Sequence, residues 1–91
     1  MKFIARSDGS TIDAFQWTAG GNQAEEPGWI LAKLRSGQVR IVDSQTALLK
    51  MEIDNGGVVR IAEIDDWIVR DRDGNVFPFR PAVFGKHYRR A

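Results

Sequence analysis

The sequence contains no cysteine and a single histidine, His87. The missing thiols exclude disulfide bonds, thiolate zinc sites and cysteine nucleophiles. A single histidine also makes a zinc site improbable, because such a site needs several ligands. No apolar run approaches the roughly 20 residues of a membrane-spanning helix. Charged residues also interrupt the N-terminal segment where a signal peptide would need an apolar stretch. We therefore expect a cytoplasmic protein with no membrane segment, no metal and no cofactor.

Charge of one sign is also lacking. The 13 basic and 12 acidic side chains nearly cancel, so the summed field gives no general attraction to nucleic acid or to a membrane surface. Any charge-dependent partner must recognise a local patch. The length of 91 residues and the hydrophobic content of 43% suffice for one small core, which predicts a single domain over residues 1–91.

Alternating polar and apolar residues predict strands along most of the chain, because successive side chains of a strand point to opposite faces. Asp8-Gly9 and Asn55-Gly56 are typical of tight hairpin turns. Pro78 cannot donate a hydrogen bond to a neighbouring strand, so the last predicted strand should lie at an edge. The expected strands cover residues 2–6, 11–17, 38–43, 46–53, 58–63, 66–71 and 76–79.

One helix is predicted within residues 25–37. Acidic residues and Pro27 stand at its start, basic residues near its end, and Gly37 where a left-handed cap would fall. Its expected apolar stripe consists of Ile30, Leu31 and Leu34, with Trp29 beside it. Residues 81–88 should add one or two helical turns. The prediction is an α+β fold with a twisted antiparallel β-sheet of about five or six strands, one helix packed on it and a short C-terminal helical turn.

Three segments together resemble a family of small proteins encoded by phages and prophages. They are Ala14-Phe15-Gln16-Trp17, Pro27-Gly28-Trp29, and the ending that runs from Asp66-Trp67-Ile68-Val69 to Tyr88. Members of that uncharacterised family typically read "EAFQW", a proline-tryptophan helix start, and then "PGDYIV…DG…YP…P…F…Y". This chain departs from the pattern at Asp13, where the family has Glu, at Ile64-Asp65, where it has Pro-Gly, and at Phe79, where it often has Cys.

The resemblance implies a phage accessory protein that acts by binding and not by catalysis. The leading hypothesis is an anti-CRISPR-like inhibitor that counters a host defence complex through protein–protein contact. The alternative is a homo-oligomeric sponge that sequesters a signalling nucleotide. No catalytic set of nucleophile, base and orienting group can be assembled from the sequence, so no enzymatic activity is predicted.

The candidate binding residues lie mainly in the C-terminal tail, where basic and aromatic side chains alternate and could grip phosphates and stack on bases. They are Arg80, Lys86, Tyr88, Arg89 and Arg90, with Trp17 as a further aromatic contact. The alternative is a solvated tail whose aromatic residues anchor the last turn to the core. Four further arginines would form an anion-binding surface if they converged on one sheet face: Arg40, Arg60, Arg70 and Arg72.

Other motifs favour structural roles. Asp71-Arg72-Asp73-Gly74-Asn75 has the oxygen-rich composition of a calcium loop but the wrong spacing, so we expect a hairpin turn. Asp65 and Asp66 are adjacent and would point to opposite faces of a strand, which predicts a turn or cap role. The three tryptophans should supply much of the core, unless one of them lies at an interface. An exposed edge at residues 76–79, or at the N-terminal ribbon, could pair with a second copy and form a homodimer.

Overall fold

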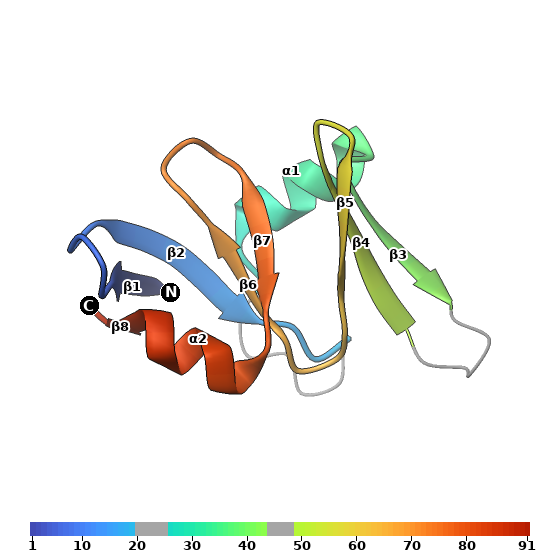
Figure 1. Ribbon diagram of the computed structural model, residues 1–91. Helices are drawn as coiled ribbons and strands as arrows, with labels where there is room; N and C mark the ends of the chain where they lie inside the picture. Colours follow the sequence, from blue (N-terminus) through green and yellow to red (C-terminus); the bar gives the residue numbers. More distant parts are fainter. Residues whose placement is uncertain (20–25, 44–48) are drawn as a thin grey trace.

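The computed structural model describes residues 1–19, 26–43 and 49–91. Within these ranges it contains two helices, α1 (Gly28–Ser36) and α2 (Pro81–His87), and the predicted α+β class is confirmed (Figure 1). The strands are β1 (Lys2–Ala5), β2 (Thr11–Gln16), β3 (Val39–Asp43), β4 (Leu49–Asn55), β5 (Val58–Ala62), β6 (Trp67–Arg70), β7 (Val76–Phe79) and β8 (Tyr88–Arg90).

The strands form two antiparallel sheets where the sequence predicted one. The large sheet has the order β7-β6-β2-β1-β8 and the small sheet the order β3-β4-β5. The strand with Pro78 lies at an edge, as predicted. The N-terminal ribbon does not, because β8 pairs with β1 through Phe3 opposite Arg90 and Ala5 opposite Tyr88. The sequence prediction missed β8, which closes that edge with the charged end of the chain.

Helix α1 begins and ends as its sequence signals indicate. Pro27 occupies the N-cap, and Gly37 ends the helix with φ = 83°, the left-handed conformation that glycine adopts without strain. Ile30 is buried and Leu34 partly buried against the core. Leu31 is 37% exposed, so its predicted place in the buried stripe is wrong. The first part of the predicted helix, including Glu25, lies outside the described residues, as do Thr46 to Leu48 of the fourth predicted strand.

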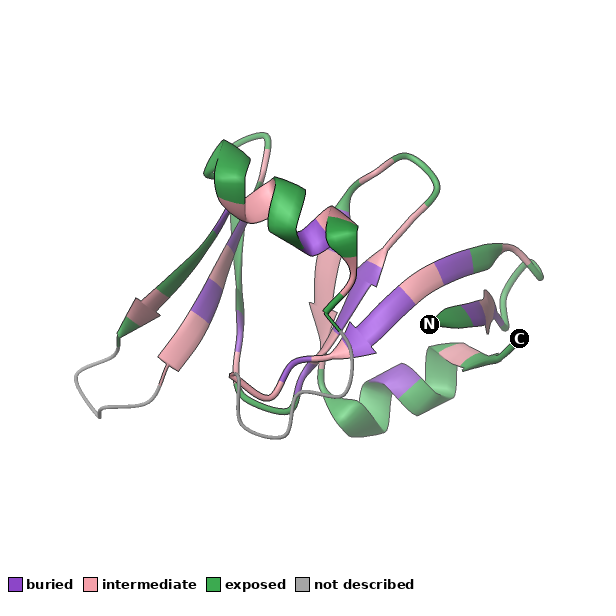
Figure 2. Cartoon of the chain, turned by 180° about the vertical axis from the view of Figure 1, so that it is seen from behind, coloured by how far each residue is buried: buried purple, intermediate pink, exposed green. Residues whose placement is uncertain are grey.

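Strand β2 serves two separate cores, one on each face of the large sheet. Ala14 belongs to a buried cluster that includes Phe84 of α2 and that we call the α2 core. Its members are Phe3, Ile12, Ala14, Val69 and Phe84. The residue after Ala14, Phe15, points to the opposite face. The α1 core on that side contains Phe15, Trp17, Ile30, Val39, Met51, Ile53, Ala62, Ile68 and Val76. In Figure 2, β2 consists of buried and intermediate residues after its exposed start, and most residues of α2 are exposed.

A polar network joins the small sheet to the large one at the end of β4. The Asn55 side chain donates to the Val76 carbonyl at 2.7 Å and accepts from the Gln38 amide at 3.1 Å. Gln38 in turn accepts from the Lys33 ammonium at 2.9 Å. The predicted turn is wrong by one residue. Asn55 pairs with Val58, so the tight turn is Gly56-Gly57, with φ values of 67° and 97°, and Asn55 is thereby free to reach β7.

The corner before β6 is built by Asp65 and Asp66. Asp65 adopts φ = 76°, a conformation that favours glycine. Its carbonyl accepts from the Gln16 amide at 3.0 Å, and its N–H donates to the Trp17 carbonyl at 2.7 Å. The buried Asp66 carboxylate accepts from the Glu63 N–H at 2.9 Å. The turn and cap roles expected of the two aspartates are therefore confirmed. No described helix is long and apolar enough to cross a membrane.

Candidate functional site

The C-terminal candidates do not form one aromatic and basic surface. Tyr88 is half-buried, with its ring 5.2 Å from that of Phe84 and 5.6 Å from that of Phe79. This burial raises the pKa of the Tyr88 phenol, with a smaller contribution from nearby carboxylates. Arg89 and Arg90 on β8, and Lys86 on α2, are exposed. The tail thus anchors its tyrosine in the α2 core and presents only its basic side chains.

Arg80 is committed to neighbouring carboxylates. Its guanidinium forms an ion pair with Glu63 and lies 3.4 Å from Asp66. The hydrogen bond from Arg80 is the main reason that the pKa of Glu63 falls below its usual range, and the same bond raises the pKa of Arg80. Arg80, the N-cap residue of α2, links the junction between β7 and α2 to the corner before β6. Its role in this structure is to neutralise two carboxylates.

Trp17 lies far from the tail in the fold. It is 7% exposed and belongs to the α1 core, on the face of the large sheet opposite to Tyr88. A ligand stacked on Tyr88 of one protomer could not contact Trp17 of the same protomer. The expectation that the tryptophans supply core contacts is confirmed, because Trp29 packs on the α1 core and Trp67 on the α2 core.

The four remaining candidate arginines scatter. Arg40 pairs with Glu52 at 2.6 Å on the outer face of the small sheet. Arg60 is in register with Ile53 and therefore lies on the inner face of that sheet. The Arg60 guanidinium lies 6.0 Å from the Phe77 ring. Arg70 covers the Trp29 ring at 5.4 Å, and Arg72 is exposed in the β6–β7 turn. The structure does not gather these side chains into an anion-binding surface.

The Asp71–Asn75 segment is a hairpin turn, as predicted. One carboxylate oxygen of Asp71 accepts from the N–H groups of Asp73 and Asn75, at 2.9 and 3.0 Å. Gly74 has φ = 86°. The carboxylate oxygen that would serve as a metal ligand is used to close the turn. Among the described residues, no group of three His, Cys, Asp or Glu side chains could hold a metal ion.

A more suitable contact surface lies on β5, which the sequence analysis treated only as a strand. Val58, Val59 and Ile61 are 58%, 55% and 45% exposed. We call these three residues the β5 surface. Val59 and Ile61 share the outer face of the small sheet, because they pair with Asp54 and Glu52 of β4, and Val58 lies on the inner face at the strand's start. The signal in the sequence was apolar residues at both odd and even positions of a strand that packs on one face only.

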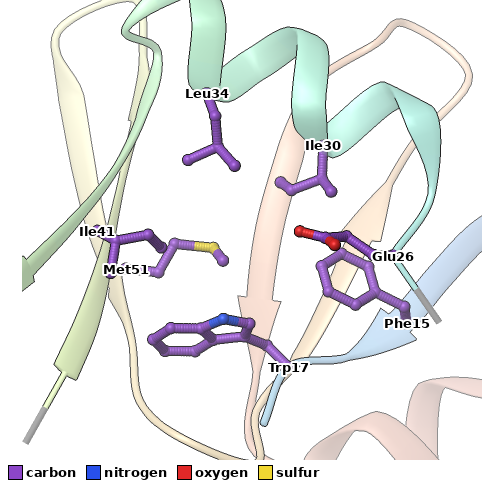
Figure 3. A pocket seen from close by; sticks show the side chains of 7 residues that line it. All are labelled: Phe15, Trp17, Glu26, Ile30, Leu34, Ile41 and Met51. Carbon is purple, nitrogen blue, oxygen red and sulfur yellow. The ribbon is translucent and has the colours of Figure 1, made fainter. Parts of the chain in front are cut away.

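An apolar pocket lies on the other side of the small sheet, beneath α1 (Figure 3). Its volume is about 200 Å³. The lining residues come from the end of β2, from α1 and its N-terminal flank, and from the inner face of the small sheet. They are Phe15, Trp17, Glu26, Ile30, Leu34, Ile41 and Met51.

Comparison with known proteins adds no relative to this description. No protein-family model, curated protein or solved structure matches the chain.

Proposed function

We propose that this chain is a non-enzymatic binding protein that contacts a partner protein through the β5 surface. The single observation that carries the proposal is the exposure of three apolar side chains on one five-residue strand. Neighbouring apolar side chains left in water are typical of protein interaction sites, whereas isolated ones are common on any surface.

The surroundings of the β5 surface suit a protein partner. Val59 and Ile61 lie beside charged residues of both signs, among them Arg40, Glu52 and Asp54. An apolar centre with a charged, solvated rim is the usual anatomy of a protein interface. The partner would therefore present an apolar strand or helix face with charges at its margin. Following the resemblance to phage proteins, we propose a host defence complex, such as a CRISPR effector, as the first partner to test.

The exposed basic side chains of the tail favour a second candidate function, sequestration of a signalling nucleotide. Lys86, Arg89 and Arg90 are exposed and could bind phosphate oxygens. The aromatic platform of that hypothesis is weaker, because Tyr88 and Trp17 are packed in separate cores. The nucleotide would therefore be held by charge alone unless a second copy supplied a ring.

The two candidates are separated by matched double variants. Val59→Lys/Ile61→Lys removes the two outer-face residues of the β5 surface and places each lysine opposite a carboxylate of β4, Asp54 or Glu52, which the strand pairing tolerates. Arg89→Ala/Arg90→Ala removes tail charge. Purified CRISPR effector complex is immobilised and binding of each protein is measured. Retention of the wild type and the arginine variant, with loss of the lysine variant, supports the proposal.

Equal retention of all three proteins, or no retention of the wild type by host defence complexes, would contradict it. A thermal shift with cyclic and linear nucleotides runs in parallel. A nucleotide-specific rise in the unfolding midpoint that disappears in the arginine variant alone would favour the sponge instead.

A further inference from the structure

We propose that the pocket beneath α1 binds a small organic ammonium compound with an apolar body. The site is distinct from the β5 surface, since it shares no residue with Val58, Val59 or Ile61, and Val59 and Ile61 lie on the opposite face of the small sheet. Its size suits one ring with a short side chain. A cavity of about 150 Å³ with Leu, Ile and Phe walls is enough to admit benzene, and this pocket measures about 200 Å³.

The walls define the body of the ligand. Ile30 and Leu34 project from α1, Ile41 and Met51 from the small sheet, and the rings of Phe15 and Trp17 close the opposite side (Figure 3). Aromatic, branched aliphatic and thioether groups favour an apolar ligand. Ile41 is 41% exposed, so the pocket is open to solvent beside it and a ligand can enter without unfolding the core.

The polar end of the ligand is defined by Glu26. Its carboxylate points into the pocket between Ile30 and Phe15 (Figure 3). No described residue donates a hydrogen bond to it or forms an ion pair with it. No arginine or lysine is found among the described lining residues. Glu26 is exposed and stands at the rim of the pocket, where a carboxylate beside an apolar space attracts a cation and disfavours an anion.

The aromatic rings add to this selectivity. An ammonium group near the face of Trp or Phe is attracted by the negative charge density of the ring. Phe15 and Trp17 line the same pocket as Glu26, so a ligand cation held by the carboxylate would lie close to at least one ring. A phosphate-bearing nucleotide has the opposite charge and does not suit this site.

The test uses three probes of nearly equal size: 2-phenylethylammonium, the neutral 2-phenylethanol and the anionic 3-phenylpropionate. Binding is followed by the indole N–H resonances of the protein in two-dimensional NMR. The Trp17 signal is assigned from its loss in a Trp17→Phe variant. We expect saturable movement of the Trp17 signal with the ammonium probe at neutral pH. The alcohol should bind about fivefold to tenfold more weakly, the usual scale of one partly exposed charge interaction.

Two variants locate the effect. Glu26→Gln should remove most of the preference for the ammonium probe over the alcohol and leave only the contribution of the aromatic rings, whereas Asp73→Asn, in the exposed β6–β7 turn, should leave the preference unchanged. The unfolding midpoint of each variant confirms that the fold is retained. Equal affinity for all three probes would overturn the proposal, because it would show an apolar pocket with no preference for charge. Absence of saturable binding would overturn it too, and so would a Glu26→Gln variant that keeps the full preference.

Discussion

Replacement of Asn55 by alanine should remove the side-chain hydrogen bonds that join the two sheets, without disturbing the strand pairing within either sheet. The Asn55 amide donates to the carbonyl of Val76, a residue with no exposed surface, and its oxygen accepts from Gln38 and, at 3.5 Å, from the Val76 N–H. Asn55→Ala removes these bonds and leaves the Val76 carbonyl without that donor. A buried acceptor left unpaired costs about 1–3 kcal/mol, and a further lost hydrogen bond costs about 1 kcal/mol. We therefore expect the free energy of unfolding to fall by about 2–4 kcal/mol.

The assay is urea unfolding followed by tryptophan fluorescence, with the slope m checked to be unchanged so that the shift of the midpoint reports stability. In a thermal scan the same loss should lower the midpoint by roughly 10–30 °C for a domain of this size. Asn75→Ala is the matched control, because Asn75 is exposed in the β6–β7 turn and only its backbone groups have hydrogen bonds there. A loss below about 0.5 kcal/mol for Asn55→Ala, or a loss equal to that of the control, would refute the role of Asn55 as a link between the sheets.

Two further predictions concern the corner before β6. Because Arg80 holds the pKa of Glu63 low, this carboxylate stabilises the fold above its ordinary pKa, and the stabilisation is lost as the pH falls through the lowered pKa. Arg80→Ala should therefore reduce stability at pH 7 and flatten this acid dependence. Urea midpoints that vary with pH identically in both proteins would contradict the assignment. Asp65 has φ = 76°, so Asp65→Val should be less stable than Asp65→Gly by about 1–3 kcal/mol in the same assay, and two variants of equal stability would show that the residue does not hold this conformation in solution.

Local features of the fold were predictable because local chemistry determines them. Pro27 and Gly37 mark the two ends of α1, Asp8-Gly9 marks the first hairpin, and Pro78 marks an edge strand. In each case one residue fixes or frees a backbone angle or removes a hydrogen-bond donor. The same reasoning identified the Asp71–Asn75 segment as a turn and not as a calcium loop.

The division into two sheets and the pairing of β8 with β1 were not predictable in this way. β8 is formed by Tyr88, Arg89 and Arg90, whose composition is typical of a solvated tail, and its partner strand lies at the other end of the chain. The sequence does contain one signal of two cores. Ile12 and Ala14 lie on one face of β2, and Phe15, with Trp17 just after the strand, lies on the other, and all four are apolar. A strand with two apolar faces is buried on both sides, which already implies two cores.

The candidate sites likewise depend on contacts between distant segments, which the sequence does not give. The composition of the tail predicts binding residues, yet Arg80 forms ion pairs with Glu63 and Asp66, and the Tyr88 ring packs against neighbouring aromatic rings. Which charges remain available depends on contacts between segments distant in the sequence. The pocket around Trp17 likewise requires α1, β2 and the small sheet to be assembled before its walls exist.

The outward residues of β5 are not the ones that folding alone would favour. The fold requires the strand's inner face, where Ala62 is fully buried. On the outer face, Val59 stands opposite Asp54 and Ile61 opposite Glu52, positions at which a lysine or arginine would form a favourable cross-strand pair and threonine would retain the β-branched shape. The chain instead places apolar side chains next to carboxylates and leaves them in water. Strand propensity does not require that choice, whereas the proposed contact with an apolar partner surface would account for it. The Val59→Lys/Ile61→Lys variant should therefore lose binding to the immobilised effector complex while its urea unfolding midpoint stays at the wild-type value.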